Sequence, residues 1–133
     1  MALKSSMKIL LVGENAGKRQ TNRGMLRKIG FKNIIEAGDG EKALAEIKEA
    51  SSEDPVALLI IDDELPKISG LEVVQAIRGD ASIAKTKVLF VLAEADQKLV
   101  VRAAQAKVNE IIISPFSSNG MMEKIGKIFG QNK

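Results

Sequence analysis

Short apolar runs alternate with segments of helical periodicity along the whole chain. The apolar runs cover residues 8–12, 56–61, 88–92 and 111–113, and residues 32–37 form a weaker strand pattern. The segments whose apolar residues recur three and four positions apart cover residues 15–29, 41–50, 69–78, 96–107 and 117–129. Strands of about five residues separated by helices are typical of consecutive β-α units. The pattern therefore predicts an α/β protein.

The run at residues 56–61, Val-Ala-Leu-Leu-Ile-Ile, is apolar throughout and has no polar alternation. Such a strand is covered on both faces, so we expect a doubly wound fold with a five-stranded parallel sheet and helices on both sides. Ser69 and Asp96 are expected helix N-caps, Ser69 with Glu72 in a capping box. In sheets of this kind ligands bind at the carboxyl ends of the strands, where we look for chemistry.

Composition restricts that chemistry. The 133 residues fit one domain, which we place at residues 7–130. Residues 1–6 are expected to be an N-terminal extension or an expression-vector remnant, and residues 131–133 a tail. The chain has no Cys and no His, so disulfides, thiolate or histidine zinc sites and histidine-dependent nucleophiles are excluded.

Charge and hydropathy restrict the partners. The net charge of +3 is mildly basic, and no aromatic residue lies within the basic stretch at residues 18–28, so a nucleic acid partner is not expected. No apolar run approaches about 20 residues, which predicts no membrane span. The first residues have no long apolar segment of the signal-peptide kind, which predicts a cytoplasmic location.

Acidic residues follow two of the predicted strands at the edge where sites form. Glu14 comes soon after the run 8–12, and Asp62 directly follows the run 56–61. Parallel strands end at the same edge, so the two carboxylates should converge, and such a pair with an open side suits Mg²⁺. Asp62 could then be a nucleophile towards phosphorus. The alternative is that Asp62 and Asp63 merely end the strand and cap the following loop.

Six segments match a known pattern: KILLVGEN at 8–15, GFKNIIEAGDGEKAL at 30–44, LLIIDDELPKISGLEVVQAIR at 58–78, VLFVLAEA at 88–95, AAQA at 103–106 and IIISPF at 111–116. They resemble the receiver domain of two-component response regulators, in the layout of the stand-alone chemotaxis regulators. The most specific feature is Asp62 four residues before Pro66 and eight before Gly70. The resemblance implies a flavodoxin-like (βα)5 fold, Asp62 as phosphoacceptor, and Mg²⁺ held by Glu14, Asp62 and the backbone carbonyl of Glu64. The Glu64 side chain itself is either a further carboxylate for the metal or a solvated loop acid.

Four positions depart from that family. Gly13 stands where the family has an acid, Leu92 where it has Thr or Ser, Ile111 where it has an aromatic residue or His, and Ser114 where it has Lys before the Pro. Loss of one positioned donor typically costs about 10²–10³ in rate, so at most slow self-phosphorylation with a weakened Mg²⁺ site is expected. The family's cis bond before Pro115 is expected here too.

Three functions remain open. The first is a phosphorelay receiver, phosphorylated at Asp62 by a histidine kinase or a phosphotransfer protein. The second is a pseudo-receiver, a phosphorylation-independent protein-interaction module, which the four departures favour. The third, an enzyme such as a small flavodoxin, is disfavoured because residues 13–18 lack the glycine spacing and the Ser/Thr of a phosphate loop. The first two readings are not enzymes beyond slow self-phosphorylation.

The resemblance implies an output face made by the fourth helix, the fifth strand and the fifth helix. Met121 and Met122 on the last helix are candidates for that surface, although Met at helical spacing is more often in the core. Lys107 replaces the usual Gly after the fourth helix, so a non-Gly residue must make that connection.

Overall fold

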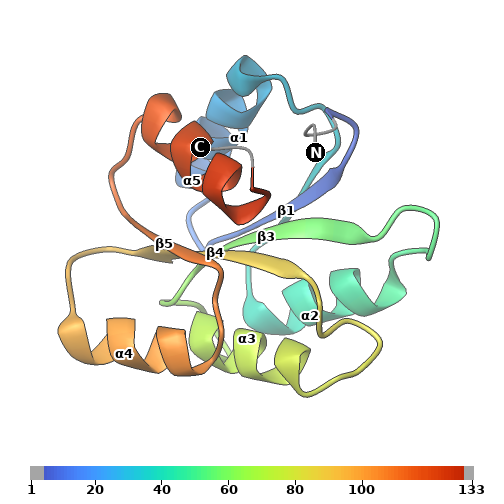
Figure 1. Ribbon diagram of the computed structural model, residues 1–133, viewed down its shortest axis with the longest axis vertical. Helices are drawn as coiled ribbons and strands as arrows, with labels where there is room; N and C mark the ends of the chain where they lie inside the picture. The colour runs from blue at the N-terminus through green and yellow to red at the C-terminus, as the bar shows by residue number, and fades with distance from the viewer. Residues whose placement is uncertain (1–4, 131–133) are drawn as a thin grey trace.

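The computed structural model describes residues 5–130, and five β-α units follow one another along them (Figure 1). The strands are β1 (Lys8–Val12), β2 (Ile34–Ala37), β3 (Val56–Asp62), β4 (Lys87–Leu92) and β5 (Glu110–Ile113). The helices are α1 (Ala16–Ile29), α2 (Gly40–Glu49), α3 (Gly70–Arg78), α4 (Gln97–Gln105) and α5 (Ser118–Ile128). The predicted α/β class and every predicted element are confirmed. The proposed extension and tail fall largely on residues 1–4 and 131–133, which lie outside the described residues.

The five strands form one parallel sheet in the order β2-β1-β3-β4-β5. Figure 1 shows α1 and α5 on one face of the sheet and α2, α3 and α4 on the other. Side chains of successive strand residues point to opposite faces. Accordingly, Ile60 belongs to the core beneath α1 and α5, and Ile61 to the core beneath the other three helices. Both residues are at most 2% exposed, which confirms that β3 is covered on both sides.

The element ends differ from the sequence prediction by one or two residues. The second strand begins at Ile34 rather than at residue 32, and α4 ends at Gln105 rather than at residue 107. The difference that matters most is at β3, where Asp62 is the last strand residue instead of the first loop residue. Its backbone is therefore fixed by pairing with Val91 of β4.

Local signals at the helix ends are confirmed. Ser69 caps α3 and forms the capping box with Glu72, and the Asp96 side chain caps α4. The bond between Ser114 and Pro115 is cis. Lys107 makes the turn after α4 in the left-handed region, with φ of 66°.

The two methionines of α5 divide between core and surface. Met121 is fully buried, whereas Met122 is 49% exposed. The helix geometry explains this, because adjacent residues point about 100° apart around the axis. Within residues 5–130, none of the helices is long and apolar enough to cross a membrane.

Candidate functional site at the end of strand β3

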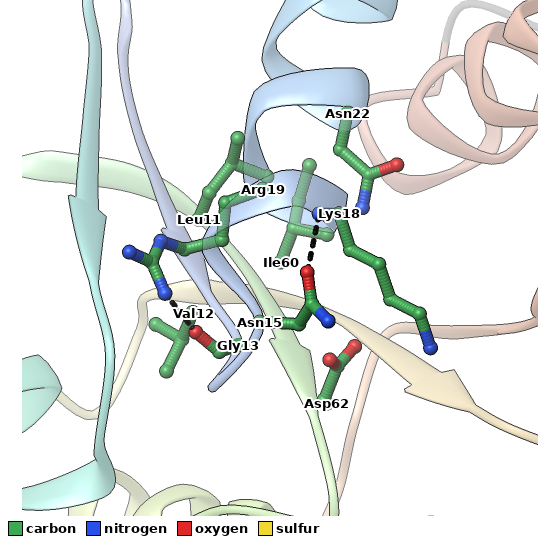
Figure 2. A pocket seen from close by; sticks show the side chains of 9 residues that line it. All are labelled: Leu11, Val12, Gly13, Asn15, Lys18, Arg19, Asn22, Ile60 and Asp62. Carbon is green, nitrogen blue, oxygen red and sulfur yellow. Dashed lines mark hydrogen bonds between the residues drawn. The ribbon is translucent and has the colours of Figure 1, made fainter.

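Asp62 stands at the carboxyl edge of the sheet, where β1 and β3 lie side by side. Val12 is paired with Ile61, so the next residues along the two strands, Gly13 and Asp62, are neighbours. Figure 2 shows the Asp62 side chain below the first turn of α1, in a recess between that helix and the strand ends. Asp62 is on the same side of β3 as Ile60, and its carboxylate therefore faces α1.

Asp62 and Asp63 have different roles although they are consecutive. The Asp63 carboxylate accepts a hydrogen bond from the Leu71 amide at 3.1 Å, and the Asp63 carbonyl accepts one from Gly70 at 2.8 Å. Asp63 thereby holds the start of α3 against the end of β3. The Asp62 carboxylate forms no hydrogen bond or ion pair with any residue in the described range. The capping alternative is thus correct for Asp63 and does not account for Asp62.

Gly70 explains part of the motif spacing in physical terms. A Cβ on Gly70 would overlap the backbone carbonyl of Asp62 and come within 2.9 Å of Cα of Asp63. The residue eight positions after Asp62 must therefore lack a side chain for α3 to begin where it does. This close approach fixes the loop between β3 and α3.

The surroundings of Asp62 disfavour its charged form. Burial raises the pKa of the Asp62 carboxyl from its ordinary value of 3.8 to about 6. The Lys18 ammonium lowers this pKa and the Glu64 carboxylate raises it, both less strongly than burial. At neutral pH the carboxylate is mainly ionised, but it is a more basic group than a solvated aspartate.

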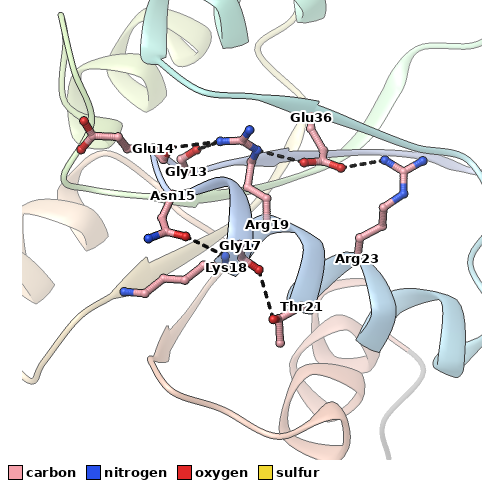
Figure 3. Close-up of polar contacts among 9 residues, drawn as sticks. All are labelled: Gly13, Glu14, Asn15, Gly17, Lys18, Arg19, Thr21, Arg23 and Glu36. Atoms are coloured by element: carbon pink, nitrogen blue, oxygen red, sulfur yellow. Dashed lines mark hydrogen bonds and ion pairs between the residues drawn. The ribbon is translucent and has the colours of Figure 1, made fainter.

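The loop between β1 and α1 is held by Arg19 (Figure 3). The Arg19 guanidinium donates to the carbonyls of Gly13 and Glu14 and to the Glu36 carboxylate, the last at 2.9 Å. Arg23 pairs with the other Glu36 oxygen at 2.8 Å. These bonds, above all to Arg23, hold the pKa of the Glu36 carboxyl below its ordinary value, although burial acts against them. Two of the basic residues in the stretch 18–28, Arg19 and Arg23, are therefore engaged in ion pairs with Glu36.

The recess at Asp62 opens into a larger cleft between the first turn of α1 and the loops after β3, β4 and β5. Six acids line this cleft: Glu14, Asp62, Asp63, Glu64, Glu94 and Asp96. Among residues 5–130, a single cation, Lys18, lines it. Neutral side chains complete the wall: Asn15, Thr21, Asn22, Met25, Val91, Leu92, Leu99, Ser114 and Phe116. The cleft is thus strongly acidic, with one positive group on the α1 side.

The residues assigned to Mg²⁺ border the same cleft. Glu14 and Glu64 are exposed, and both line the cleft with Asp62. Within residues 5–130, no group of three or more acidic side chains is close enough together to hold a metal ion. A cation site here would consist of two carboxylates, a backbone carbonyl and waters, which is a donor set of the kind Mg²⁺ accepts. The ligand assignment stays a prediction.

The family departures take different positions around the cleft. The Leu92 side chain is 1% exposed and belongs to the core on the α2, α3 and α4 side of the sheet. Ile111 packs against the same core. Ser114 lines the cleft, and its amide donates to the Leu92 carbonyl at 2.8 Å. No side chain of β5 or of the residue that follows it brings a positive charge to the cleft.

Three contributors to this region were missed as site residues in the sequence. Asn15 caps α1 by accepting from the Lys18 amide at 2.9 Å, Arg19 holds the loop, and Lys18 faces Asp62. Lys18 could have been found by its position, because a cation in the first turn of a helix opposes the helix dipole. No acid is present in that turn to offset it.

Known proteins with this sequence pattern and fold are response regulator receivers. The family model for the response regulator receiver domain matches residues 9–126. The chemotaxis protein CheY of Pseudomonas aeruginosa is 36% identical over 123 residues, which cover 92% of this chain and 96% of that protein. CheY-3 of Vibrio cholerae is 35% identical over 127 residues, which cover 96% of this chain and 95% of that protein.

Solved structures agree on the fold. The chemotaxis response regulator CheY4 of Vibrio cholerae superposes with a TM-score of 0.82 at 22% identity, covering 92% of this chain and 98% of that one. A CheY-like receiver domain protein from Methanospirillum hungatei superposes with a TM-score of 0.82 at 21% identity, covering 95% of this chain and 96% of that one. The chain belongs to the response regulator receiver domain family, and its relatives are of the stand-alone CheY-like kind. Receivers of this family are signalling modules rather than enzymes; they typically bind Mg²⁺ at the phosphorylation site and interact with histidine kinases.

Proposed function

We propose that this receiver accepts a phosphoryl group on Asp62, slowly, in a two-component phosphorelay of the cytoplasm. One observation carries the proposal: of two consecutive acids at the end of β3, Asp63 is used by the fold and Asp62 is not. The Asp62 carboxylate has no partner among the described residues and faces an open cleft. A partly buried, unpartnered carboxylate costs stability, and such groups are retained mainly at functional sites.

The chain's own residues define the chemistry. An oxygen of Asp62 would form a bond to the phosphorus of an acyl phosphate or phosphohistidine donor, and the donor would leave with the electron pair of the broken bond. Burial makes the carboxylate more basic and therefore a better nucleophile. The neutral Ser114 and the buried Leu92 give the phosphoryl oxygens little support from β4 and β5, so the reaction is slow.

Glu14, Asp62 and the Glu64 carbonyl are the groups we propose for holding Mg²⁺. All are oxygen donors, and the cleft around them is acidic, which attracts a divalent cation. When bound, Mg²⁺ would supply positive charge near the phosphoryl oxygens. Gly13 provides no side-chain ligand, so we expect weak binding that leaves several waters on the ion.

The test is intact-mass spectrometry after incubation with Mg²⁺ and acetyl phosphate. We expect one added phosphoryl group on the wild-type protein and none on Asp62→Asn. Asp63→Asn is the matched control, since an Asn oxygen can still accept from the Leu71 amide, and it should be modified like the wild type. If acetyl phosphate and a phosphohistidine donor both leave the wild type unmodified, Asp62 is not a phosphoacceptor.

A second candidate is a constitutive protein-interaction module, and a surface observation favours it. In the described part of the chain, three large apolar side chains are markedly exposed: Val101 at 49%, Ile113 at 40% and Met122 at 49%. They lie on α4, β5 and α5, which form one edge of the molecule in Figure 1. A contiguous exposed apolar surface is typical of protein-binding sites, and these three side chains are the candidates for such a surface along this edge.

This candidate is distinguished by its independence of Asp62. Proteins retained from cell extract by the immobilised wild type would be retained equally by Asp62→Asn and lost with Val101→Asp. Retention that depends on Asp62 and on a phosphodonor would instead assign this surface to a phosphorylation-controlled output.

A further inference from the structure

We propose that Lys18, on the first turn of α1, is the positive group that contacts the phosphoryl oxygens at Asp62. The inference rests on the proposed phosphoacceptor function and adds to it a residue of the chemistry. It is carried by the side chains that line the cleft, not by motif spacing.

Lys18 is the only cation among the described residues lining the cleft, against six acids. Arg19 also borders the recess beneath α1, but its guanidinium is engaged with the Gly13 carbonyl and Glu36. A phosphoryl donor entering this acidic cleft meets repulsion, and Lys18 is the positive charge that the described cleft residues place against it.

Figure 2 shows the Lys18 side chain descending beside the Asp62 carboxylate, while Arg19 turns to the opposite side. The Lys18 ammonium forms no ion pair within 4.0 Å with Asp62 or any other described acid. It nevertheless acts electrostatically on Asp62. The two groups face one another across a gap that a phosphoryl group on Asp62 would enter.

The first turn of α1 is an unfavourable place for a Lys. Lys18 is the third residue of α1, where the helix dipole favours an acid by about 0.3–1 kcal/mol and disfavours a cation. The Lys18 ammonium forms no hydrogen bond or ion pair in the described range, so what favours the charge here is its electrostatic interaction with Asp62. A position that is unfavourable for the helix and faces the unpartnered carboxylate indicates a role in the site.

In the transfer, an Asp62 oxygen bonds to phosphorus, the bond from phosphorus to the donor breaks, and the donor departs with that electron pair. The three remaining oxygens keep their negative charge, and the Lys18 ammonium stabilises them. No proton moves. A Lys on α1 thus supplies charge that Ser114, after β5, does not.

The test compares Lys18→Met, Lys18→Arg and Lys28→Met. The Met variant removes the charge and keeps an unbranched side chain, the Arg variant keeps the charge, and Lys28→Met removes the same charge from the exposed far end of α1. Two measurements are made: the rate of acetyl phosphate modification with Mg²⁺, and the binding of beryllofluoride, a phosphoryl mimic, followed by fluorine NMR. Urea unfolding accompanies both.

We expect Lys18→Met to slow modification by about 10- to 100-fold and to weaken beryllofluoride binding, with no loss of stability. Lys18→Arg and Lys28→Met should stay within about threefold of the wild type. Equal rates for Lys18→Met and the wild type would overturn the inference and leave the proposed function standing. Beryllofluoride binding that depends on Lys18 without any covalent adduct would support the inference and end the proposed function. If the wild type binds no beryllofluoride and forms no adduct, both fall.

Discussion

Gly13 and Asp62 are in contact distance at the ends of neighbouring strands: a Cβ on Gly13 would lie 2.8 Å from Oδ2 of Asp62. The absence of a side chain at residue 13 lets the carboxylate occupy this space. The same absence leaves residue 13 without a carboxylate for the Mg²⁺ site that we propose at Asp62. The steric fit of Asp62 and the lack of an acidic side chain at residue 13 therefore have one cause.

Replacing Gly13 by Asp is expected to make the free energy of unfolding depend on Mg²⁺. Without metal, two adjacent carboxylates repel each other and lower the free energy of unfolding by about 1–2 kcal/mol. Saturating Mg²⁺ should recover this loss, because a ligand that binds the folded state stabilises it. Thermal unfolding in EDTA and in Mg²⁺ measures both effects. Gly13→Ala imposes the same displacement without the charge, and an equal response of the two variants to Mg²⁺ would refute the explanation.

Asp62 is expected to reduce the stability of its own domain. Because its pKa is raised from 3.8 to about 6 in the folded protein, the folded state binds more protons between these values than the unfolded state. Stability therefore falls as pH rises through this window, and the full loss is present above pH 6. In EDTA at pH 7, Asp62→Asn should raise the free energy of unfolding by about 1–3 kcal/mol.

Urea unfolding of Asp62→Asn and wild type from pH 3.5 to pH 7.5 checks this expectation. The difference in free energy of unfolding between Asp62→Asn and the wild type should be small near pH 3.5 and should grow towards neutral pH. A constant difference across the range would mean that volume or hydrogen bonding, and not ionisation, causes it. Asp63→Asn provides the contrast, because Asp63 accepts a hydrogen bond from the fold and should not stabilise when replaced.

The fold could be predicted from the sequence because four of the five strands are short apolar runs, and segments of helical periodicity separate the strands. The two-sided burial of β3 follows from six consecutive apolar residues. β-α alternation indicates a parallel sheet but leaves the strand order open, and the order β2-β1-β3-β4-β5 comes from the structure. Strand ends were less certain, since pairing with Val91 extends β3 to Asp62. Only the register with a neighbouring strand decides such an end.

The site was predictable in its central residue and not in its surroundings. Spacing to Pro66 and Gly70 marked Asp62, and the packing of Gly70 on the Asp62 carbonyl explains that spacing. Asp62 and Asp63 have different roles because only the Asp63 carboxylate accepts a hydrogen bond from the Leu71 amide. The spacing of residues along the sequence does not show which of the two carboxylates does so. Lys18 faces Asp62 only because α1 begins above the end of β3.

Glu36 is expected to stabilise the β1–α1 loop in a pH-dependent way. Hydrogen bonds from Arg23 and Arg19 hold its pKa below the ordinary value of 4.5, so its contribution is present above that pH and is lost as pH falls through the lower folded-state pKa. Glu36→Gln should lower the free energy of unfolding at pH 7 by about 1 kcal/mol, since the pair is partly solvent-screened.

Circular dichroism of Glu36→Gln during urea unfolding at pH 7 and pH 3 tests this. The difference from wild type should diminish at pH 3. Glu123→Gln serves as control, because Glu123 is exposed and forms no ion pair among the described residues. Equal effects of the two substitutions at both pH values would contradict a specific role of Glu36.

Lys107 is expected to be a locally unfavourable residue. Its φ of 66° lies in the left-handed region, which costs a non-Gly residue about 1–2 kcal/mol. Lys107→Gly relieves this strain but increases the freedom of the unfolded chain, so we expect a net gain of about 0.5–1 kcal/mol. The Lys107 carbonyl, which accepts from Arg78 at 2.9 Å, is kept. Thermal unfolding measures the gain, and a loss of stability would show that the side chain contributes more than its backbone costs.

A Lys at residue 114 should compensate for the loss of Lys18 if positive charge is what the cleft lacks. Ser114 lines the cleft from the β5 side, opposite α1, so Ser114→Lys brings an ammonium to Asp62 by a second route. In the Lys18→Met background this substitution should restore most of the acetyl phosphate reactivity, whereas in the wild type it should add less, because the two charges act on the same oxygens. Intact-mass kinetics on the four proteins of this cycle measure the coupling. Ser114→Gln, which has similar length and no charge, is the control. Independent, additive effects of the two positions would show that Lys18 acts on the fold or on donor binding and not on the phosphoryl oxygens at Asp62.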